Sequence, residues 1–304
     1  MNSAYRINSI SHAYLLLHLP KPMHPLIGLI DNLSLSVDPS QLPNPHVLNF
    51  YKISYRARFN GKLMYGQGYY DFDEGGLLFA APNQVVGNKD YNDDTGDKSG
   101  YTLLIHPDFF LGYPIARHIK QYGFFSYTAN EALHLSDKEK ETIIAIFKFM
   151  EEELNSRIDD FSQPIMISQI ELLLNYANRF YKRQFLTRKA VNSELLQKLD
   201  DILEAWFTNE TSLNKGIPTV QYLAEQVKLS PNYVSDMLRS LIGQNAQQYI
   251  HTILIEKAKE KLSVTRLSVS EVAYNLGFEY PQSFSKLFKA KTNLSPIEFR
   301  RLFN

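Results

Sequence analysis

The sequence predicts an α+β protein of two domains: an N-terminal antiparallel β barrel or sandwich with helices, and a C-terminal all-α domain. Its 304 residues suit two domains, since one domain usually takes about 100–200 residues. Strand patterns, beginning with a period of two at 51–59, extend up to about residue 125, and the hydrophobic pattern becomes helical from Ser136. A helical pattern that begins after Pro218 recurs once before the end of the chain.

Composition excludes several classes of protein. Lys+Arg and Asp+Glu both number 32, so the chain is neither uniformly basic nor uniformly acidic. Cysteine is absent, which excludes disulfides, Cys-ligated zinc, iron–sulfur clusters and thiol catalysis and suits a reducing cytoplasm. No apolar run approaches the ~20 residues of a membrane span, and residues 13–17 make a poor signal peptide. We therefore expect a soluble cytoplasmic protein with no membrane partner.

Charge is divided unevenly along the chain. Residues 211–304 carry 12 Lys/Arg and 7 Asp/Glu, a net charge of +5, whereas residues 1–210 carry 20 and 25, a net charge of −5. A basic module joined to an acidic remainder is typical of a nucleic-acid-binding domain attached to another domain. Chance alone also produces an imbalance of this size.

The N-terminal part has strand patterns. Residues 1–45 are rich in proline, which favours short strands and loops. Apolar and polar residues alternate over 51–59, as in a strand with one wet face, and Asn60-Gly61 is a hairpin signal. Further strands are predicted at 65–72, 77–81 and 101–106, with a polar loop at 87–100 before the last of them.

Two long helices follow. Ser136 and Glu139 have the spacing of a capping box, and apolar residues recur at helical intervals through Met150. A second helix, at about 164–185, has a broad apolar stripe. These stripes either cover the β domain or pair with a second copy of the chain, and both arrangements can hold together.

The repeat consists of two helix-turn-helix units. The first unit has Ser230 as an N-cap before Pro231 and Gly243 as a left-handed C-cap, and Asn293 takes the C-cap position in the second. The matching positions first lie 49 and then 50 residues apart: Val220/Val269, Leu223/Val272, Ala224/Ala273, Val227/Leu276, Leu229/Phe278, Ser235/Ser285, Leu238/Phe288, Arg239/Lys289, Gly243/Asn293 and Tyr249/Phe299.

The intervening segment, at about 245–262, reads as one continuous helix. Its eighteen residues at ~1.5 Å per residue give about 27 Å, so it could hold the two units about one DNA turn apart.

The second helix of each unit has a polar outer face. Short hydrogen-bonding and cationic side chains of this kind read base edges and contact phosphates, although packed helical hairpins without DNA binding are the alternative. The faces comprise Asn232, Ser235, Asp236 and Arg239 in the first unit, and Gln282, Ser283, Ser285, Lys286 and Lys289 in the second.

The second unit contains Val272-Ala273, Leu276-Gly277-Phe278, Phe284, Lys286, Phe288-Lys289, Leu294-Ser295-Pro296 and Phe299-Arg300. With these residues at this spacing, it resembles the AraC/XylS family of bacterial transcription regulators. The first unit matches at Leu223-Ala224, Leu229-Ser230, Tyr233-Val234-Ser235, Leu238 and Gly243, so the resemblance covers about residues 217–304.

The resemblance implies roles and boundaries. It implies that the nine polar-face residues contact DNA and that Lys289 and Arg300 contact phosphates. Members with an extra N-terminal domain carry a cupin-like β barrel followed by dimerisation helices. The segments expected are a cupin-like sensor domain at 1–130, a dimerisation segment at 131–188, a linker helix region at 189–212 and the DNA-binding domain at 213–304. The expected partners are double-stranded DNA, a small-molecule effector, a second copy of the chain and RNA polymerase.

Nothing in the sequence predicts an enzyme or a cofactor. The eight histidines are dispersed without a His-x-His pair, so no metal site is expected. The Asp90, Asn92, Asp94 loop lacks the glycine and the last glutamate of a calcium loop. An aromatic-rich β domain suits a small effector, and His46, Tyr51 and Tyr55 are the candidate pocket residues. In the alternative, the N-terminal domain is only a dimerisation or protein-interaction platform without a ligand.

Overall fold

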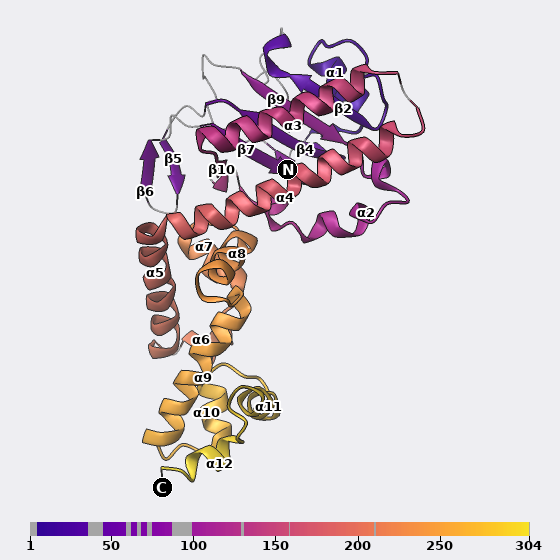
Figure 1. Cartoon of the computed structure of the whole chain (residues 1–304). Helices are drawn as coiled ribbons and strands as arrows, with labels where there is room; N and C mark the ends of the chain where they lie inside the picture. Colours follow the sequence, from indigo (N-terminus) through magenta and orange to yellow (C-terminus); the bar gives the residue numbers. More distant parts are fainter. Residues whose placement is uncertain are drawn as a thin grey trace. The chain divides into compact units, whose positions relative to one another are not determined.

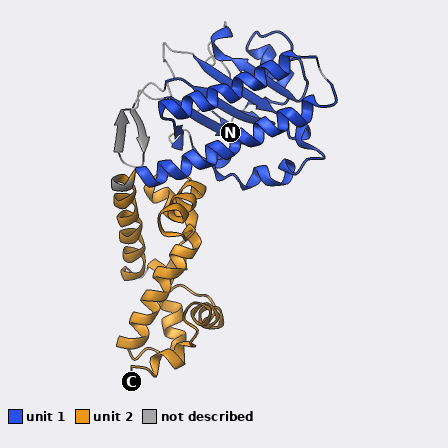
Figure 2. Cartoon of the chain, viewed as in Figure 1, with its two compact units in different colours: residues 1–187 blue, residues 188–304 orange. Residues whose placement is uncertain are grey.

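The computed structural model divides the chain into two compact units, Met1–Thr187 and Arg188–Asn304 (Figure 2). It describes residues 5–35, 45–58, 62–65, 68–71, 75–86, 99–128, 131–157, 159–209 and 211–303. Strands occur only in the first unit among these residues, and the described part of the second unit is helical, in keeping with a mixed α and β chain.

A five-stranded antiparallel sheet forms the centre of unit 1 (Figure 1). Its register pairs Ile53 with Leu103 and with Phe79, which places these apolar side chains in the buried layer. The strands, in their order across the sheet, are β10 (Leu133–His134), β7 (Gly76–Ala80), β4 (Tyr51–Arg56), β9 (Gly100–Ile105) and β2 (Ile27–Asp31).

Two smaller sheets complete the strand content of the described residues. β5 (Lys62–Tyr65) and β6 (Gly68–Asp71) form an antiparallel pair. β3 (His46–Leu48) pairs antiparallel with β8 (Val85–Val86) but parallel with β1 (Tyr5–Ile7), so the expectation of a wholly antiparallel domain is wrong at this pair. The Asn60-Gly61 turn and residues 87–98, with Asp90, Asn92 and Asp94, lie outside the described residues.

The N-terminal segment holds a helix where only strands and loops were expected. In α1 (Ile10–Leu16) the Ser9 side chain accepts the backbone N–H of His12 at 3.1 Å, which caps the first turn. Ile10, Ala13 and Tyr14 are buried on the same face. The short helical elements of the unit are η1 (Asn32–Ser34), η3 (Pro107–Phe110), α2 (Ile115–His118), η4 (Ile119–Gln121) and η5 (Gly123–Ser126).

The two long helices cover the sheet (Figure 1). α3 (Asp137–Asn155) stacks its Phe147 ring on Tyr101 of β9 at 5.4 Å between ring centroids. α4 (Ser162–Thr187) places Tyr181 6.3 Å from the ring of Phe79 in β7. The apolar stripes are therefore buried within one copy of the chain, which is the first of the two arrangements expected. The predicted Ser136–Glu139 capping box at the start of α3 is confirmed.

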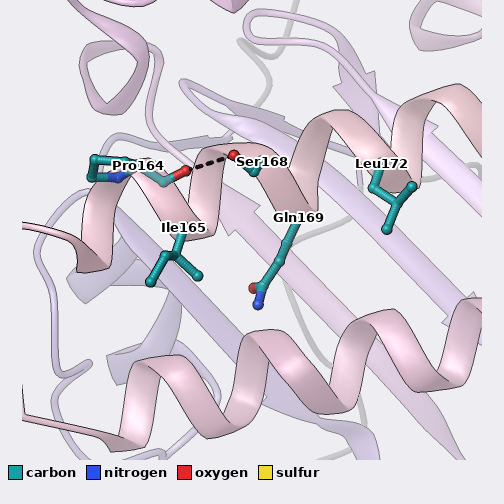
Figure 3. Close-up of a pocket in the computed structure, with 5 residues that line it drawn as sticks. All are labelled: Pro164, Ile165, Ser168, Gln169 and Leu172. Carbon is teal, nitrogen blue, oxygen red and sulfur yellow. Dashed lines mark hydrogen bonds between the residues drawn. The ribbon is translucent and has the colours of Figure 1, made fainter.

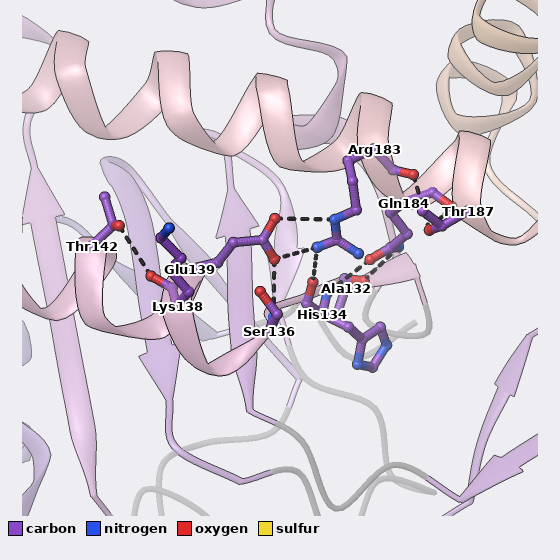
Figure 4. A network of polar contacts seen from close by, with 9 residues as sticks. All are labelled: Ala132, His134, Ser136, Lys138, Glu139, Thr142, Arg183, Gln184 and Thr187. Carbon is purple, nitrogen blue, oxygen red and sulfur yellow. Dashed lines mark hydrogen bonds and ion pairs between the residues drawn. The ribbon is translucent and has the colours of Figure 1, made fainter.

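Side chains of α4 cap the edge strand β10 (Figure 4). The Gln184 amide accepts the His134 N–H at 2.9 Å and donates to the Ala132 carbonyl at 3.2 Å, in place of a further strand. Arg183 donates to the His134 carbonyl at 2.8 Å and to the Glu139 carboxylate at 2.6 Å. The last turn of α4 is thereby joined to both the sheet and α3.

Gln184→Ala is expected to lower the free energy of unfolding of unit 1 by about 2 kcal/mol, because two buried backbone groups lose their partner. Gln163→Ala on the same helix removes one bond from an exposed side chain to the Phe109 carbonyl and should cost less than about 1 kcal/mol. Urea denaturation of both variants measures the difference. Equal losses would contradict the role assigned to Gln184.

Unit 2 begins with α5 (Lys189–Thr208) and α6 (Thr211–Lys215), the region expected to be a linker. Trp206 and Phe207 of α5 belong to the same buried cluster as Leu254, Phe284 and Phe288. α5 is therefore packed into the helical core of this unit. The remaining helices are α7 (Val220–Val227), α8 (Pro231–Ile242), α9 (Ala246–Val264), α10 (Val269–Asn275), α11 (Pro281–Thr292) and α12 (Pro296–Arg300).

Candidate nucleic-acid interface

α7 and α8 form the first predicted helix-turn-helix unit. Lys228 ends α7 in the left-handed region, with φ of 58°. The Ser230 hydroxyl accepts the Tyr233 N–H at 3.2 Å, Pro231 opens α8, and Gly243 ends it with φ of 73°. These caps confirm the sequence prediction, and they define the length and start of the second helix of the unit.

α10 and α11 form the second helix-turn-helix unit by the same means. Ser268 and Glu271 make a capping box, and the hydrogen bonds from Ser268 lower the pKa of the Glu271 carboxyl. Gly277 in the turn has φ of 89°, and Asn293 ends α11 with φ of 63°. The predicted C-cap role of Asn293 is therefore confirmed, and Phe284 on the inner face of α11 is fully buried.

α9 joins the two helix-turn-helix units as one helix. Its 19 residues span about 28 Å at ~1.5 Å per residue. Asn245 and Gln248 form a capping box at its start, and α8, α10 and α12 all contact it. The helix-turn-helix units are thus mounted on a common continuous helix, as the sequence predicts.

The outer face of α8 is held by local contacts. Asn232 and Arg239 are exposed, and Arg239 Nη1 lies 2.5 Å from Asp236 Oδ1. The Ser235 hydroxyl accepts the Ala246 N–H at 3.1 Å, so this side chain fixes the start of α9. The geometry leaves Asn232 and the Asp236–Arg239 pair as the polar groups open to a ligand on this face.

The outer face of α11 is basic. Gln282, Ser283, Lys286 and Lys289 are exposed, whereas Ser285 is half-buried. α11 contains no acidic residue. Lys289 lies close enough to Glu298 to help lower the pKa of that carboxyl, after the hydrogen bonds from Ser295. The two helix-turn-helix units therefore present different charges at matching positions.

Arg300 has a contact inside unit 2. Its Nε donates to the Leu262 carbonyl at 3.3 Å, at the end of α9, and its buried Nη2 has no hydrogen-bond partner among the described residues. This guanidinium stabilises the C-terminal end of α9. Its contact with phosphate stays a prediction.

Residues 206–217, of which residue 210 is not described, form a strap that contacts the second helix-turn-helix unit, and the residues up to 212 were expected to be linker. Trp206 Nε1 donates to the Gly216 carbonyl at 3.0 Å, and the Ser212 hydroxyl donates to the Asn275 carbonyl at 2.6 Å. A Cβ on Gly277 would lie 2.5 Å from the carbonyl carbon of Gly216. The segment before α7 therefore rests directly on the turn between α10 and α11.

α5 is also tied to α9 by polar contacts. Lys257 Nζ lies 2.6 Å from Glu204 Oε1, and this hydrogen bond lowers the pKa of the Glu204 carboxyl. Tyr249 donates its hydroxyl to Asp200, and burial is the first cause of the raised pKa of this tyrosine. The signal for this packing was the apolar spacing of Leu195, Leu199, Leu203 and Trp206, all of which are buried.

The candidate effector residues lie inside unit 1. His46 on β3 and Tyr51 and Tyr55 on β4 are all buried. Tyr51 packs its ring 5.0 Å from that of Phe125, and burial raises the pKa of the tyrosine. These three side chains are part of the buried core of unit 1. Their contact with an effector stays a prediction.

An open groove lies instead on the surface of α4 (Figure 3). It holds about 340 Å³ and is lined by Pro164, Ile165, Ser168, Gln169 and Leu172. The Gln169 Oε1 atom is buried and has no hydrogen-bond partner among the described residues. Leu172 is 46% exposed, although it lies in the helix predicted to have a broad apolar stripe.

The described part of the chain has neither a metal-binding cluster nor a membrane-spanning helix. It contains no cluster of three or more His, Cys, Asp or Glu side chains that could hold a metal ion. None of the helices described there is both long and apolar enough to cross a membrane.

The C-terminal unit is similar to known proteins. Residues 223–302 match the family model described as a helix-turn-helix domain. The arabinose operon regulatory protein of Escherichia coli is 32% identical over 120 residues, which cover 38% of this chain and 41% of that protein. The uncharacterized HTH-type transcriptional regulator YisR of Bacillus subtilis is 33% identical over 84 residues, which cover 28% of this chain and 29% of that protein. The chain thus spans less than half the length of either relative.

A solved structure is also similar. The C-terminal domain of the two-component response regulator yesN from Fusobacterium nucleatum shares 30% sequence identity. The alignment covers 34% of this chain and 95% of that one, with a TM-score of 0.30. Of the two relatives above, one is named as a transcriptional regulator and the other as an operon regulatory protein.

Proposed function

We propose that this chain, whose residues 223–302 form an AraC-type helix-turn-helix domain, regulates transcription in the cytoplasm by binding a specific DNA sequence. The observation that carries the proposal is the pair of capped helix-turn-helix units on α9, each with an exposed polar face. Base edges are read by such second helices, and phosphates by the cations beside them. RNA polymerase is the further partner expected if the chain acts as an activator.

The full chain binds a subset of DNA fragments from its source genome under this proposal. Fragments are incubated with purified protein at ~150 mM salt, because nonspecific phosphate binding dominates at lower salt. Retention of a few fragments far above the rest supports sequence-specific binding. Equal retention of all fragments, or retention of none, contradicts it.

The surface of α4 supports dimerisation. Ile165 and Leu172 are 41% and 46% exposed and line the groove that contains the unpartnered Gln169 oxygen. Exposed apolar side chains that lie on the same face of a helix are typical of helices that pair with a second copy. A second copy would cover both side chains and could supply a donor for the Gln169 oxygen, which makes the homodimer the favoured occupant of this groove.

Ile165→Glu combined with Leu172→Glu is expected to convert dimers to monomers at micromolar concentration, because both charges would be buried at the interface. Size-exclusion chromatography with light scattering measures the mass. Leu15→Glu is the matched control, since Leu15 on α1 is 71% exposed and lies outside the groove. A variant that stays dimeric, or a wild type that is monomeric, contradicts this interface.

Unit 1 is proposed to be a cupin-like sensor of a small molecule. Its antiparallel sheet, closed off by α3 and α4, and its aromatic core support this interpretation. The alternative keeps unit 1 as a dimerisation or protein-interaction platform. A thermal-shift screen with a metabolite library separates them: a ligand that raises the Tm of the full chain supports sensing, and a screen without a hit favours the platform.

A further inference from the structure

The second helices of the two helix-turn-helix units, α8 and α11, differ in charge at one of two equivalent positions. With the fifty-residue offset of the repeat, Asp236 on α8 corresponds to Lys286 on α11, and Arg239 corresponds to Lys289. α8 therefore has an acid and a base where α11 has two bases. The α8 pair adds no net charge to the interface. Its contribution to DNA binding therefore depends on directional hydrogen bonds rather than on a net attraction to phosphates.

An ion pair links Asp236 and Arg239 on the outer face of α8. Arg239 Nη1 lies 2.5 Å from Asp236 Oδ1, three residues earlier on the same helix. The Asp236 side chain is 28% exposed and the Arg239 side chain is 56% exposed, so the carboxylate is the inner member and the guanidinium the outer one. The Ser240 hydroxyl donates to the Asp236 carbonyl at 2.8 Å and further orders this turn.

An arginine held in this way keeps most of its donors. A guanidinium has five N–H donors, and the bond to Asp236 uses Nη1. The remaining edge matches the O6 and N7 acceptors of guanine, which a bidentate arginine reads in the major groove. Fixing the side chain before binding reduces the conformational entropy that a free arginine would lose on contact.

We propose that Asp236 positions the Arg239 guanidinium to read one guanine, so that Arg239 is a specificity-determining residue and Asp236 its positioning residue. The proposal rests on the proposed DNA-binding function and adds a division of labour to it. The neutral pair of the first helix-turn-helix unit supplies base discrimination. The lysines of the second supply the charge-dependent part of the affinity.

The test compares variants on the DNA site that the wild-type chain selects. Dissociation constants are measured for wild type, Arg239→Lys, Arg239→Ala and Asp236→Ala, on that site and on sites with each base pair substituted, across a salt series. Lys259→Ala is the control, because it removes an exposed pair of the same spacing, Glu256–Lys259, from α9. Circular dichroism verifies that each variant is folded.

Arg239→Ala is expected to lose about 5- to 150-fold discrimination at one guanine and little elsewhere. Arg239→Lys keeps the charge but lacks the planar fork, so it should lose the same discrimination. Asp236→Ala should reduce discrimination at that same guanine. The slope of log Kd against log salt should change by less than about one unit in Asp236→Ala, because positioning adds no phosphate contact.

Other outcomes overturn the proposal. If Arg239→Lys discriminates as well as wild type, Arg239 acts only as a point charge. If Asp236→Ala raises the affinity equally on all sequences, Asp236 is only a repulsive charge. If the wild-type chain selects no sequence at all, the proposed DNA-binding function fails. If the wild-type chain selects a site and the variants discriminate it as well as wild type does, only the roles of Asp236 and Arg239 are wrong.

Discussion

Gly277→Ala is expected to lower the free energy of unfolding of unit 2 by about 2–5 kcal/mol, the sum of a backbone cost and a packing cost. Gly277 has φ of 89°, where an L side chain costs about 1–2 kcal/mol. Its new Cβ would also lie 2.5 Å from the Gly216 carbonyl carbon and 2.8 Å from the Ile217 nitrogen. These neighbours are backbone atoms, and overpacking of this kind adds about 1–3 kcal/mol.

Gly243→Ala is the matched control. Gly243 has φ of 73°, but nothing lies within 4 Å of its added Cβ, so only the backbone cost of about 1–2 kcal/mol applies. Calorimetry of the full chain should show the transition of unit 2 at a lower temperature in Gly277→Ala than in Gly243→Ala. Equal transitions would mean that the strap of residues 206–217 does not rest on the turn between α10 and α11.

Lys286→Ala is expected to weaken binding to the selected DNA site by about 5- to 150-fold and to change the preferred sequence. Lys286 is exposed on α11, and the helix carries no acid that could neutralise it. Competition binding against a library of substituted sites measures both effects. Equal weakening on all sequences would instead make Lys286 a phosphate contact.

Two further variants serve as comparisons for Lys286→Ala: Lys289→Ala tests a phosphate contact, and Lys138→Ala is the control for net charge. Lys289 is the expected phosphate contact, so its loss should weaken binding to all sequences and reduce the salt slope by about 0.9. Lys138 is an exposed lysine at the start of α3 in unit 1, and its removal changes the net charge equally. Lys138→Ala should leave both affinity and salt slope unchanged.

The helical part of the fold is predictable because its signals are local. Ser230-Pro231, Ser268 with Glu271, and Asn293 each specify a helix end through contacts within a few residues. The same holds for the Ser136–Glu139 box at the start of α3. These helix boundaries therefore follow from residues adjacent to them.

The features that sequence reasoning missed depend on distant partners. The parallel pairing of β1 with β3 joins segments about forty residues apart, and no local pattern encodes strand direction. Trp206 packs in the core of unit 2 with residues from position 254 onward. Because these partners are distant in the sequence, the region around Trp206 was expected to be a linker. α1 and α5 are the exceptions, because Ser9 with the spacing of Ile10 and Ala13, and the apolar spacing of α5, carried local signals.

The sequence predicts which helix faces form the candidate site, but not which side chains on those faces are already hydrogen-bonded within the protein. Sequence spacing identified the outer faces of α8 and α11, and exposed Asn232, Arg239 and Lys286 lie there. It did not show that Ser235 bonds to Ala246 or that Arg300 bonds to Leu262. Such contacts arise from tertiary packing, which decides whether a polar side chain on a recognition helix is open to a ligand or already engaged.

The most direct test of the central claim is in-vitro selection of DNA bound by the purified full chain at ~150 mM salt. Two helix-turn-helix units mounted on α9 predict a recovered motif of two blocks whose centres lie about one helical turn, or ~10 base pairs, apart. A single block, blocks at variable spacing, or recovery without sequence preference would contradict the account.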